Sequence, residues 1–399
     1  MLNLRSNRNK FIIHSFFYSG AISTAEPSTV LPLIVNYFSS SNILVGIFSS
    51  LLRGGAVVMQ MYAAFYAQGY ERVINYLRFI FIFRFAAWFS IGLSIYFFGN
   101  SNPDLTLLLF GIGLFLFSFS AGFGTVYFQE LMGKCFTKEY RGQTLAYRQF
   151  FAGLAAILSG FLSAYFLRTF DKPMSFAYLF FVSSIIMVFS YFALGSIKED
   201  AKKKVMIREK SFKQFLRNTR RFLKYDKNLR FQIIIMLISY TYLFALPFVV
   251  LNIKSHMNLA DAGILLSVQM GGAMISNLAW ARMAKRNLNK QIVIISFALM
   301  IVAFFIAIIF QNFWWYGVLF FLVGSSNDGF KLAFSNLILI ITTEDKRPVY
   351  IAIQNNITSL GLFFSIPGGF LLNLLGFVPL IIIVIAMLFM GLFLSLKLR

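Results

Sequence analysis

Four ionisable side chains lie inside long apolar stretches of the sequence, where a charge is costly. Glu26 and Arg53 fall near the middle of the first two stretches, and Asp328 and Lys331 fall together in the tenth. An ionisable residue in such a setting usually faces a cavity or a partner. A carboxylate there could carry a proton, and a base there could bind an anionic group.

These charges can be read in two ways. In the structural reading, Asp328 neutralises Lys331 at i,i+3, and Glu26 neutralises Arg53 across two helices. In the functional reading the pairs are switchable, because a proton or a charged substrate can compete for a partner. We expect Glu26 and Asp328 to be the proton carriers. Pro27 follows Glu26, so the backbone there should be distorted.

Weaker candidates are polar residues on helices expected to line a substrate cavity, although each alone is more often a packing residue. With Arg53 and Lys331, they are Gln60, Tyr240, Tyr242, Gln269 and Asn355. We interpret Arg84 as a side chain that snorkels inward or braces its half-domain, with a substrate role as the weaker alternative. His14 and His256 fall near opposite membrane faces and are interpreted as interfacial residues.

The composition identifies the class of protein. The chain has 399 residues, of which 59% are hydrophobic and 13% charged, with a mean hydropathy of +0.75. A soluble domain is about a quarter charged, so lipid must cover much of this apolar surface. One cysteine, Cys135, and two histidines argue against a disulfide and against a His/Cys metal site. No phosphate-binding GxxxxGK[ST] loop occurs, and we expect no cofactor.

Twelve apolar runs have about the twenty residues that an α-helix needs to cross a bilayer. The pattern therefore predicts an all-α integral membrane protein with twelve transmembrane helices. The runs are 11–38, 43–68, 79–98, 105–132, 144–167, 174–196, 231–252, 259–283, 291–310, 313–342, 349–373 and 376–396.

The basic residues predict the topology. Thirty of the 36 Lys and Arg residues fall in the segments of one side and three in the loops of the other. By the positive-inside rule, both termini are cytoplasmic. The net charge of +22 is then topogenic. Because these bases are scattered over seven segments, nucleic-acid binding is a poor interpretation.

A basic segment divides the chain in two. We predict an N-terminal six-helix half over residues 1–196, a cytoplasmic linker over 197–229 and a C-terminal six-helix half over 230–399. In the linker, phenylalanines alternate with bases. It could therefore lie as an amphipathic helix on the anionic leaflet, or be a solvated connection.

The two halves contain a repeat. Residues 122–154 align without gaps with residues 328–360, so that the fourth and tenth runs match together with the loops after them. Such duplication is typical of secondary transporters, whose substrate site lies at the repeat interface. In each loop an acidic residue precedes an arginine by two positions. We expect these residues to hold the cytoplasmic face closed: Glu139, Arg141, Asp345 and Arg347. Glu130 could serve this gate, or an interface.

Twelve helices, cytoplasmic termini and the duplication resemble the major facilitator superfamily. Its loop motif of the Gly-x-x-x-Asp-Arg type is partly kept in "NLAWARMAKRNLNK" (277–290), and more weakly in "AAFYAQGYERVINY" (63–76). The resemblance implies that Arg282 and Arg286 belong to the cytoplasmic gate. The stretch "EDKRPVYIAIQN" (344–355) resembles a less-studied bacterial branch. Runs nine and twelve, which would face lipid in this fold, carry almost no polar residue.

This resemblance implies a secondary active transporter, not an enzyme, that moves a small organic solute across a bacterial inner membrane by alternating access. We expect proton coupling, with sodium coupling as the alternative, and a monomer. Arg53 and Lys331 would favour an anionic substrate unless ion pairs consume both bases. A lipid or amphiphile flippase on the same fold is the first alternative. An integral-membrane transferase or hydrolase is a weaker one, since no catalytic cluster is visible.

Overall fold

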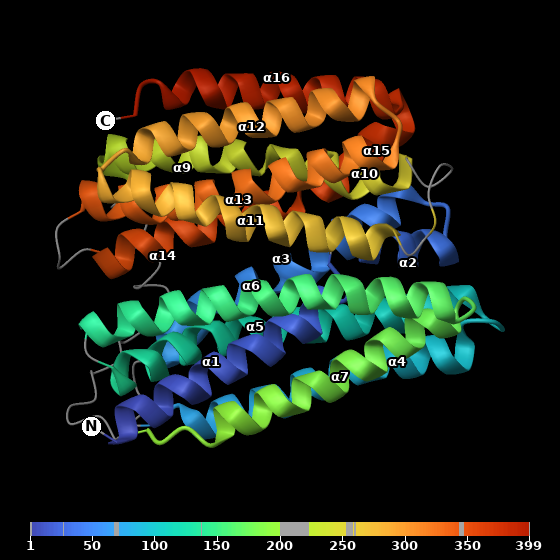
Figure 1. Cartoon of the computed structure of the whole chain (residues 1–399), viewed down its shortest axis with the longest axis horizontal. Helices are drawn as coiled ribbons and strands as arrows, with labels where there is room; N and C mark the ends of the chain where they lie inside the picture. Colours follow the sequence, from blue (N-terminus) through green and yellow to red (C-terminus); the bar gives the residue numbers. More distant parts are fainter. Residues whose placement is uncertain are drawn as a thin grey trace. The chain divides into compact units, whose positions relative to one another are not determined.

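The computed structural model describes residues 2–26, 28–67, 72–136, 138–199, 223–252, 258, 261–342 and 347–398. Within these ranges all regular structure is helical (Figure 1). The chain forms two compact units. Unit 1 comprises Met1–Glu26 and Leu51–Phe215, and unit 2 comprises Pro27–Ser50 and Leu216–Arg399.

The helices follow the predicted runs. Most of unit 1 is formed by α1 (Leu2–Ser23), α3 (Asn42–Ala67), α4 (Ile74–Phe98), α5 (Pro103–Cys135), α6 (Lys138–Thr169) and α7 (Met174–Gly195), although α3 begins in unit 2. Unit 2 also holds α2 (Val30–Phe38), α9 (Lys227–Ser239), η1 (Tyr240–Phe244), α10 (Leu246–Asn252), α11 (Asp261–Lys285), α12 (Asn289–Ile309), α13 (Phe313–Ile341), α14 (Arg347–Thr358), η3 (Ser359–Phe363), α15 (Ser365–Leu375) and α16 (Phe377–Ser395).

Each of the twelve runs contains a helix. In the part of the chain that the structure describes, nine helices are long and apolar enough to cross a membrane. The all-α membrane fold is thus confirmed, while the full count of twelve spans stays a prediction.

Three runs are interrupted rather than continuous. The expected distortion near Glu26 is confirmed, because α1 ends at Ser23 and α2 begins at Val30. The interruptions in the seventh and eleventh runs were not predicted: each holds a 3-10 segment, η1 or η3. A proline follows each one, Pro247 in α10 and Pro367 in α15. Because proline has no N–H to donate, it fits the first turn of a new helix better than a helix interior.

The two units repeat the same internal packing. In unit 1, α4 packs on α5 and α7, and α1 packs on α6 and α7. In unit 2, α12 packs on α13 and α16, and α9 packs on α14 and α16. These pairs correspond one to one in chain order, so the similarity of residues 122–154 and 328–360 extends to the tertiary structure of each unit.

The ends of α5 and α13 show the repeat locally. Both helices begin at an asparagine cap: Asn102 accepts from the backbone N–H of Leu105 at 3.0 Å, and Asn312 from that of Trp315 at 3.1 Å. Both end at an extended residue, Phe136 or Thr342. Phe136 and Thr342 stand opposite each other in the alignment of the repeat, so sequence and structure agree on where each helix stops.

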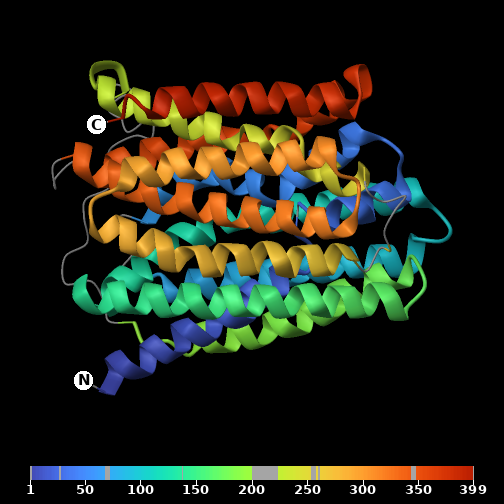
Figure 2. The ribbon, with the colours of Figure 1, turned by 45° about the horizontal axis from the view of Figure 1, so that its top comes forward.

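Glycines set the close approach of α11 and α13, which lie side by side (Figure 1 and Figure 2). A Cβ atom on Gly272 would collide with the backbone of Phe321, and one on Gly324 with the carbonyl of Gln269. Small residues let membrane helices approach in this way. Ser325 uses the proximity, donating its hydroxyl to the carbonyl of Gly272 at 3.1 Å.

The units do not follow the predicted division of the chain. That division places all of residues 1–196 in one half, whereas residues Pro27–Ser50 group with unit 2 by their contacts. The cause is local: α2 packs on α10 and α11, and Gly46 of α3 meets the backbone of Ser365. The boundaries 1–196, 197–229 and 230–399 remain a prediction.

We expect Gly324→Ala to lower the midpoint of thermal unfolding of the detergent-purified protein, because the added methyl group must push α11 away from α13. Overpacking of this kind costs about 1–3 kcal/mol. Gly317→Ala, on the same helix with nothing within 4 Å of its Cβ position, is the matched control. Equal midpoints for the two variants would contradict the glycine contact.

Candidate functional site

Asp328 is held in the middle of α13 by two partners. One carboxylate oxygen, Oδ2, accepts a hydrogen bond from the Asn277 side-chain amide at 2.8 Å, and Oδ1 lies 3.3 Å from the Lys331 ammonium. Asn277 stands on α11, so the glycine contact between the two helices brings it within reach. We call Asn277, Asp328 and Lys331 the Asp328 cluster. The predicted i,i+3 contact is confirmed, whereas Asn277 was missed.

The two charges of this cluster are unequally covered. The Asp328 side chain is 14% exposed, but that of Lys331 is 73% exposed. The carboxylate is therefore the more covered partner of the ion pair. The Asn277 hydrogen bond is part-buried and holds the other carboxylate oxygen. Whether the pair is structural or switchable stays a prediction.

Other predicted cavity residues of unit 2 lie at the interrupted helices or on α11. Tyr240 and Tyr242 both belong to η1, with Tyr242 buried and Tyr240 half-buried. Gln269 is buried on α11 and accepts a hydrogen bond from the Ser28 hydroxyl at 3.0 Å. The structure therefore places Gln269 against the stretch that precedes α2.

The buried side-chain amide of α14 belongs to Gln354, not to the predicted Asn355. Asn355 is exposed, whereas its neighbour Gln354 is buried and accepts a hydrogen bond from the Gln232 amide at 3.0 Å. Gln232 also donates to the backbone carbonyl of Phe334 at 3.2 Å. These hydrogen bonds connect α9, α13 and α14, a structural role that the sequence did not predict.

The structure describes the side chains of Glu26 and Gln60 but not that of Arg53. Glu26 is 5% exposed, in the non-helical stretch between α1 and α2. Gln60 is half-buried on α3. The Arg53 side chain lies outside the described part of the chain, so a Glu26–Arg53 pair stays a prediction.

The predicted gate is only partly described. Glu130 is half-buried near the end of α5, and Arg282 and Arg286 are exposed at the end of α11 and in the turn after it. Asp345 lies outside the described residues, as do the side chains of Glu139, Arg141 and Arg347. The gate therefore stays a prediction.

Unit 1 contains a cavity that the sequence did not predict. It has a volume of about 350 Å³ and lies among α1, α4, α5 and α6. Its polar lining includes His14, Ser15, Tyr18, Arg84, Gln129 and Arg148. None of its fifteen described lining residues is acidic. We call it the arginine cavity.

Aromatic rings hold the two arginines in this cavity. The Arg84 guanidinium lies 4.2 Å from the ring centre of Phe117 and 5.0 Å from that of Tyr18, and the Arg148 guanidinium lies 4.4 Å from that of Phe128. Such cation–π contacts contribute about 0.5–2 kcal/mol each. They stabilise the charges without neutralising them.

His14 is the centre of the same cluster. Its ring lies 5.1 Å from that of Phe81 and 5.3 Å from that of Phe128, and Nδ1 lies 2.6 Å from the Ser190 hydroxyl. Only 3% of His14 is exposed, so its ring packs inside unit 1. Its predicted place near a membrane face stays a prediction, and His256 lies outside the described residues. Arg84 is 5% exposed, so its guanidinium lies inside unit 1, and its predicted role stays a prediction.

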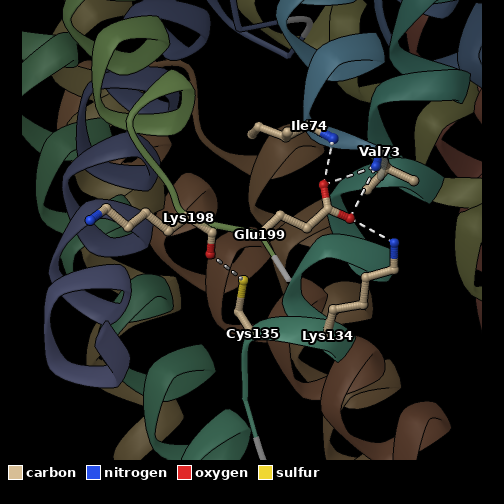
Figure 3. Close-up of polar contacts among 6 residues, drawn as sticks. All are labelled: Val73, Ile74, Lys134, Cys135, Lys198 and Glu199. Carbon is tan, nitrogen blue, oxygen red and sulfur yellow. Dashed lines mark hydrogen bonds and ion pairs between the residues drawn. The ribbon is translucent and has the colours of Figure 1, made fainter. Parts of the chain in front are cut away.

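A polar contact network closes one end of unit 1 where α7 ends (Figure 3). Glu199 accepts hydrogen bonds from the backbone N–H groups of Val73 and Ile74, at 2.9 and 2.8 Å, and so caps the first turn of α4. It also pairs with Lys134 of α5 at 2.6 Å. The beginning of the predicted linker is therefore fastened to unit 1.

The neighbouring backbone is fastened as well. Asn7 of α1 exchanges two hydrogen bonds with Lys198, and the Cys135 thiol lies 3.8 Å from the Lys198 carbonyl. Lys10 and Arg78 donate to the carbonyls of Ser196 and Gly195. We call residues 195–199 the docked segment.

No group of three His, Cys, Asp or Glu side chains within the described ranges could hold a metal ion. The charged groups described above are the Asp328 carboxylate beside Lys331 in unit 2, and the Arg84 and Arg148 guanidiniums beside the His14 imidazole in unit 1.

Glu199→Gln should destabilise unit 1, because it removes the carboxylate that pairs with the buried Lys134 ammonium; the Glu199 and Lys134 side chains are 0% and 10% exposed. Breaking one partner of a buried pair costs about 3–5 kcal/mol. Glutamine still offers an oxygen to cap α4. The double variant with Lys134→Met should recover most of the loss in the thermal unfolding midpoint. Strictly additive effects of the two changes would exclude the coupling.

The chain is similar to known proteins in part of its sequence and in its fold. Residues 231–399 match the family model described as Major Facilitator Superfamily. No curated protein matches the sequence.

Solved structures match nearly the whole chain. A mutant form of the nucleoside transporter NupG is 12% identical, with a TM-score of 0.75 and coverage of 98% of this chain and 99% of that one. A bacterial homologue of the iron transporter ferroportin is 10% identical, with a TM-score of 0.73 and 98% of both chains covered. A D-xylose-proton symporter is 12% identical, with a TM-score of 0.69 and coverage of 100% and 96%. At these identities the likeness is one of fold, and the similarity to the Major Facilitator Superfamily model covers residues 231–399.

Proposed function

We propose that the protein is a secondary active transporter that moves a small organic solute across the cytoplasmic membrane by alternating access, coupled to protons. The match of residues 231–399 to the Major Facilitator Superfamily model and the transporters among the proteins of similar fold support transport rather than catalysis. One protein of similar fold is named a D-xylose-proton symporter, and this likeness supports proton coupling.

The observation that carries the proposal is the Asp328 cluster. A carboxylate inside a membrane helix is costly and marks an ion or proton path by default. Asp328 keeps one shielded hydrogen bond to Asn277 and one contact to the exposed Lys331. Protonation would leave an oxygen for Asn277 and remove the attraction for Lys331. A proton would thus change the ion pair while the side chain stays in place.

The other predicted residues take roles around this cluster. Glu26 is the second candidate proton carrier. Arg53 and Lys331, with the polar residues on the same helices, would contact the solute: Gln60, Tyr240, Tyr242, Gln269 and Asn355. The two loop pairs, with Glu130 and the two arginines near the end of α11, would form the cytoplasmic gate.

Asp328→Asn tests the coupling role. It should abolish accumulation driven by a pH gradient in liposomes, because the amide cannot titrate, while counterflow exchange persists. Since the substrate is unidentified, a thermal-shift screen of a metabolite library supplies the solute for the flux assay.

The double variant Asp328→Asn with Lys331→Met separates the two readings of the pair. If the charges only neutralise each other, removing both should restore stability and transport. If Asp328 carries the proton, stability alone should recover. Gradient-driven accumulation at the parent rate in the double variant would exclude Asp328, and Glu26 would become the leading candidate.

We also propose that both termini face the cytoplasm of a bacterial cell. Cys135 is the only cysteine and is half-buried beside the docked segment. A membrane-impermeant maleimide should label it in inverted vesicles and not in intact cells, with Cys135→Ser as the blank. Labelling of intact cells at the rate seen in inverted vesicles would reverse the topology.

A further inference from the structure

We propose that the arginine cavity of unit 1 is a binding site for the carboxylate or phosphate group of a small organic anion with an aromatic or apolar body. The inference goes beyond the proposed function and does not depend on it, because none of the residues assigned above to the transported solute lines this cavity. It uses side chains of unit 1 and does not involve the Asp328 cluster.

The first argument is the charge balance of the cavity. Arg84 and Arg148 both line it, and neither forms an ion pair with a carboxylate of the described residues. A guanidinium keeps its charge in proteins. Buried charges are normally paired because desolvation is expensive. A bound anion would therefore neutralise the two guanidinium charges of this cavity.

The second argument is an unused donor. Arg84 is 5% exposed, and its Nε atom has no hydrogen-bond partner. Arg148 uses its own Nε on the Ser15 hydroxyl, which orients the rest of the guanidinium. A planar guanidinium presents paired donors that match the geometry of a carboxylate or phosphate.

The third argument concerns size and the apolar wall. About 350 Å³ lies within the range of small-molecule pockets. The rings of Tyr18, Phe81 and Phe128 and the side chains of Met132 and Leu145 complete the lining. A free inorganic ion would leave this apolar surface unused. An anionic group joined to an aromatic or apolar body would cover it.

His14 adds a donor or acceptor to the site. Its Nδ1 is engaged by Ser190 of α7, and its ring is fixed among Tyr18, Phe81 and Phe128. The ring is thus oriented before any ligand arrives. Preorganisation of this kind reduces the entropic cost of binding.

Matched probe pairs test the proposal on the full-length protein in detergent, without any gradient. Isothermal titration would compare benzoate with benzamide, and phenyl phosphate with phenol. We expect at least one anion to bind at least about 10-fold more tightly than its neutral partner, as a charged hydrogen bond implies. Equal affinity within both pairs, or no binding by either anion, would overturn the proposal.

Variants then locate the site. Arg148→Gln should weaken the bound anion about 10-fold or more, and Arg148→Lys less, because lysine keeps the charge without the fork. Arg168→Gln, an exposed arginine of the same helix α6, is the control and should bind like the parent. If Arg148→Gln binds the anion like the parent, the cavity is not the site. The comparison of probe pairs on the parent protein stands even if a variant does not fold.

A lipid headgroup offers the same chemistry as a soluble anion. Repeating the titration in nanodiscs with and without phosphatidylglycerol separates the two sources: competition by this lipid assigns the site to a headgroup, and its absence to a soluble anion. Asp328→Asn should bind the anion normally. Failure of proton coupling and failure of anion binding can therefore be told apart.

Discussion

Charge buried within an apolar helical bundle must find a partner, and this constraint governs the polar interior of each unit. In unit 2, Asp328 is reached by Asn277 only because glycines let α11 and α13 approach. In unit 1, aromatic rings contact Arg84 and Arg148, and no carboxylate of the described residues forms an ion pair with them. At the end of unit 1, Glu199 likewise accepts hydrogen bonds from two backbone N–H groups and pairs with the Lys134 ammonium.

The two units share a packing scheme but use it for different chemistry. The same pairs of helices meet in each, and α5 and α13 stop at matching positions. Unit 1 surrounds its cavity with basic and aromatic side chains, whereas unit 2 places a carboxylate on α13. A similar scaffold thus carries a different electrostatic character in each unit.

Much of the fold could be predicted from the sequence, because long apolar runs permit only helices in lipid. The Asp328–Lys331 contact followed from helical spacing alone. Arg148 was missed because it lies close to the start of its run and was counted with the topogenic bases. Glu199 was missed for a related reason: it stands in a segment dominated by lysine and arginine. Asn277 and His14 could not be found, since their roles depend on which helices touch. The proline that follows each 3-10 segment was a usable signal for the interrupted helices.

The docked segment has a consequence for how unit 1 is made. Its residues bind Asn7 and Lys10 near the beginning of the chain, and α1 packs mainly on α6 and α7. During synthesis, α1 therefore emerges long before its partners exist. Contacts so distant in sequence form late and slow the folding of a domain. Until residue 199 has left the ribosome, α4 lacks its cap, and Asn7 and Lys10 of α1 lack the backbone carbonyls that they bind. The docked segment must therefore be in place before α1 and α4 reach their final contacts.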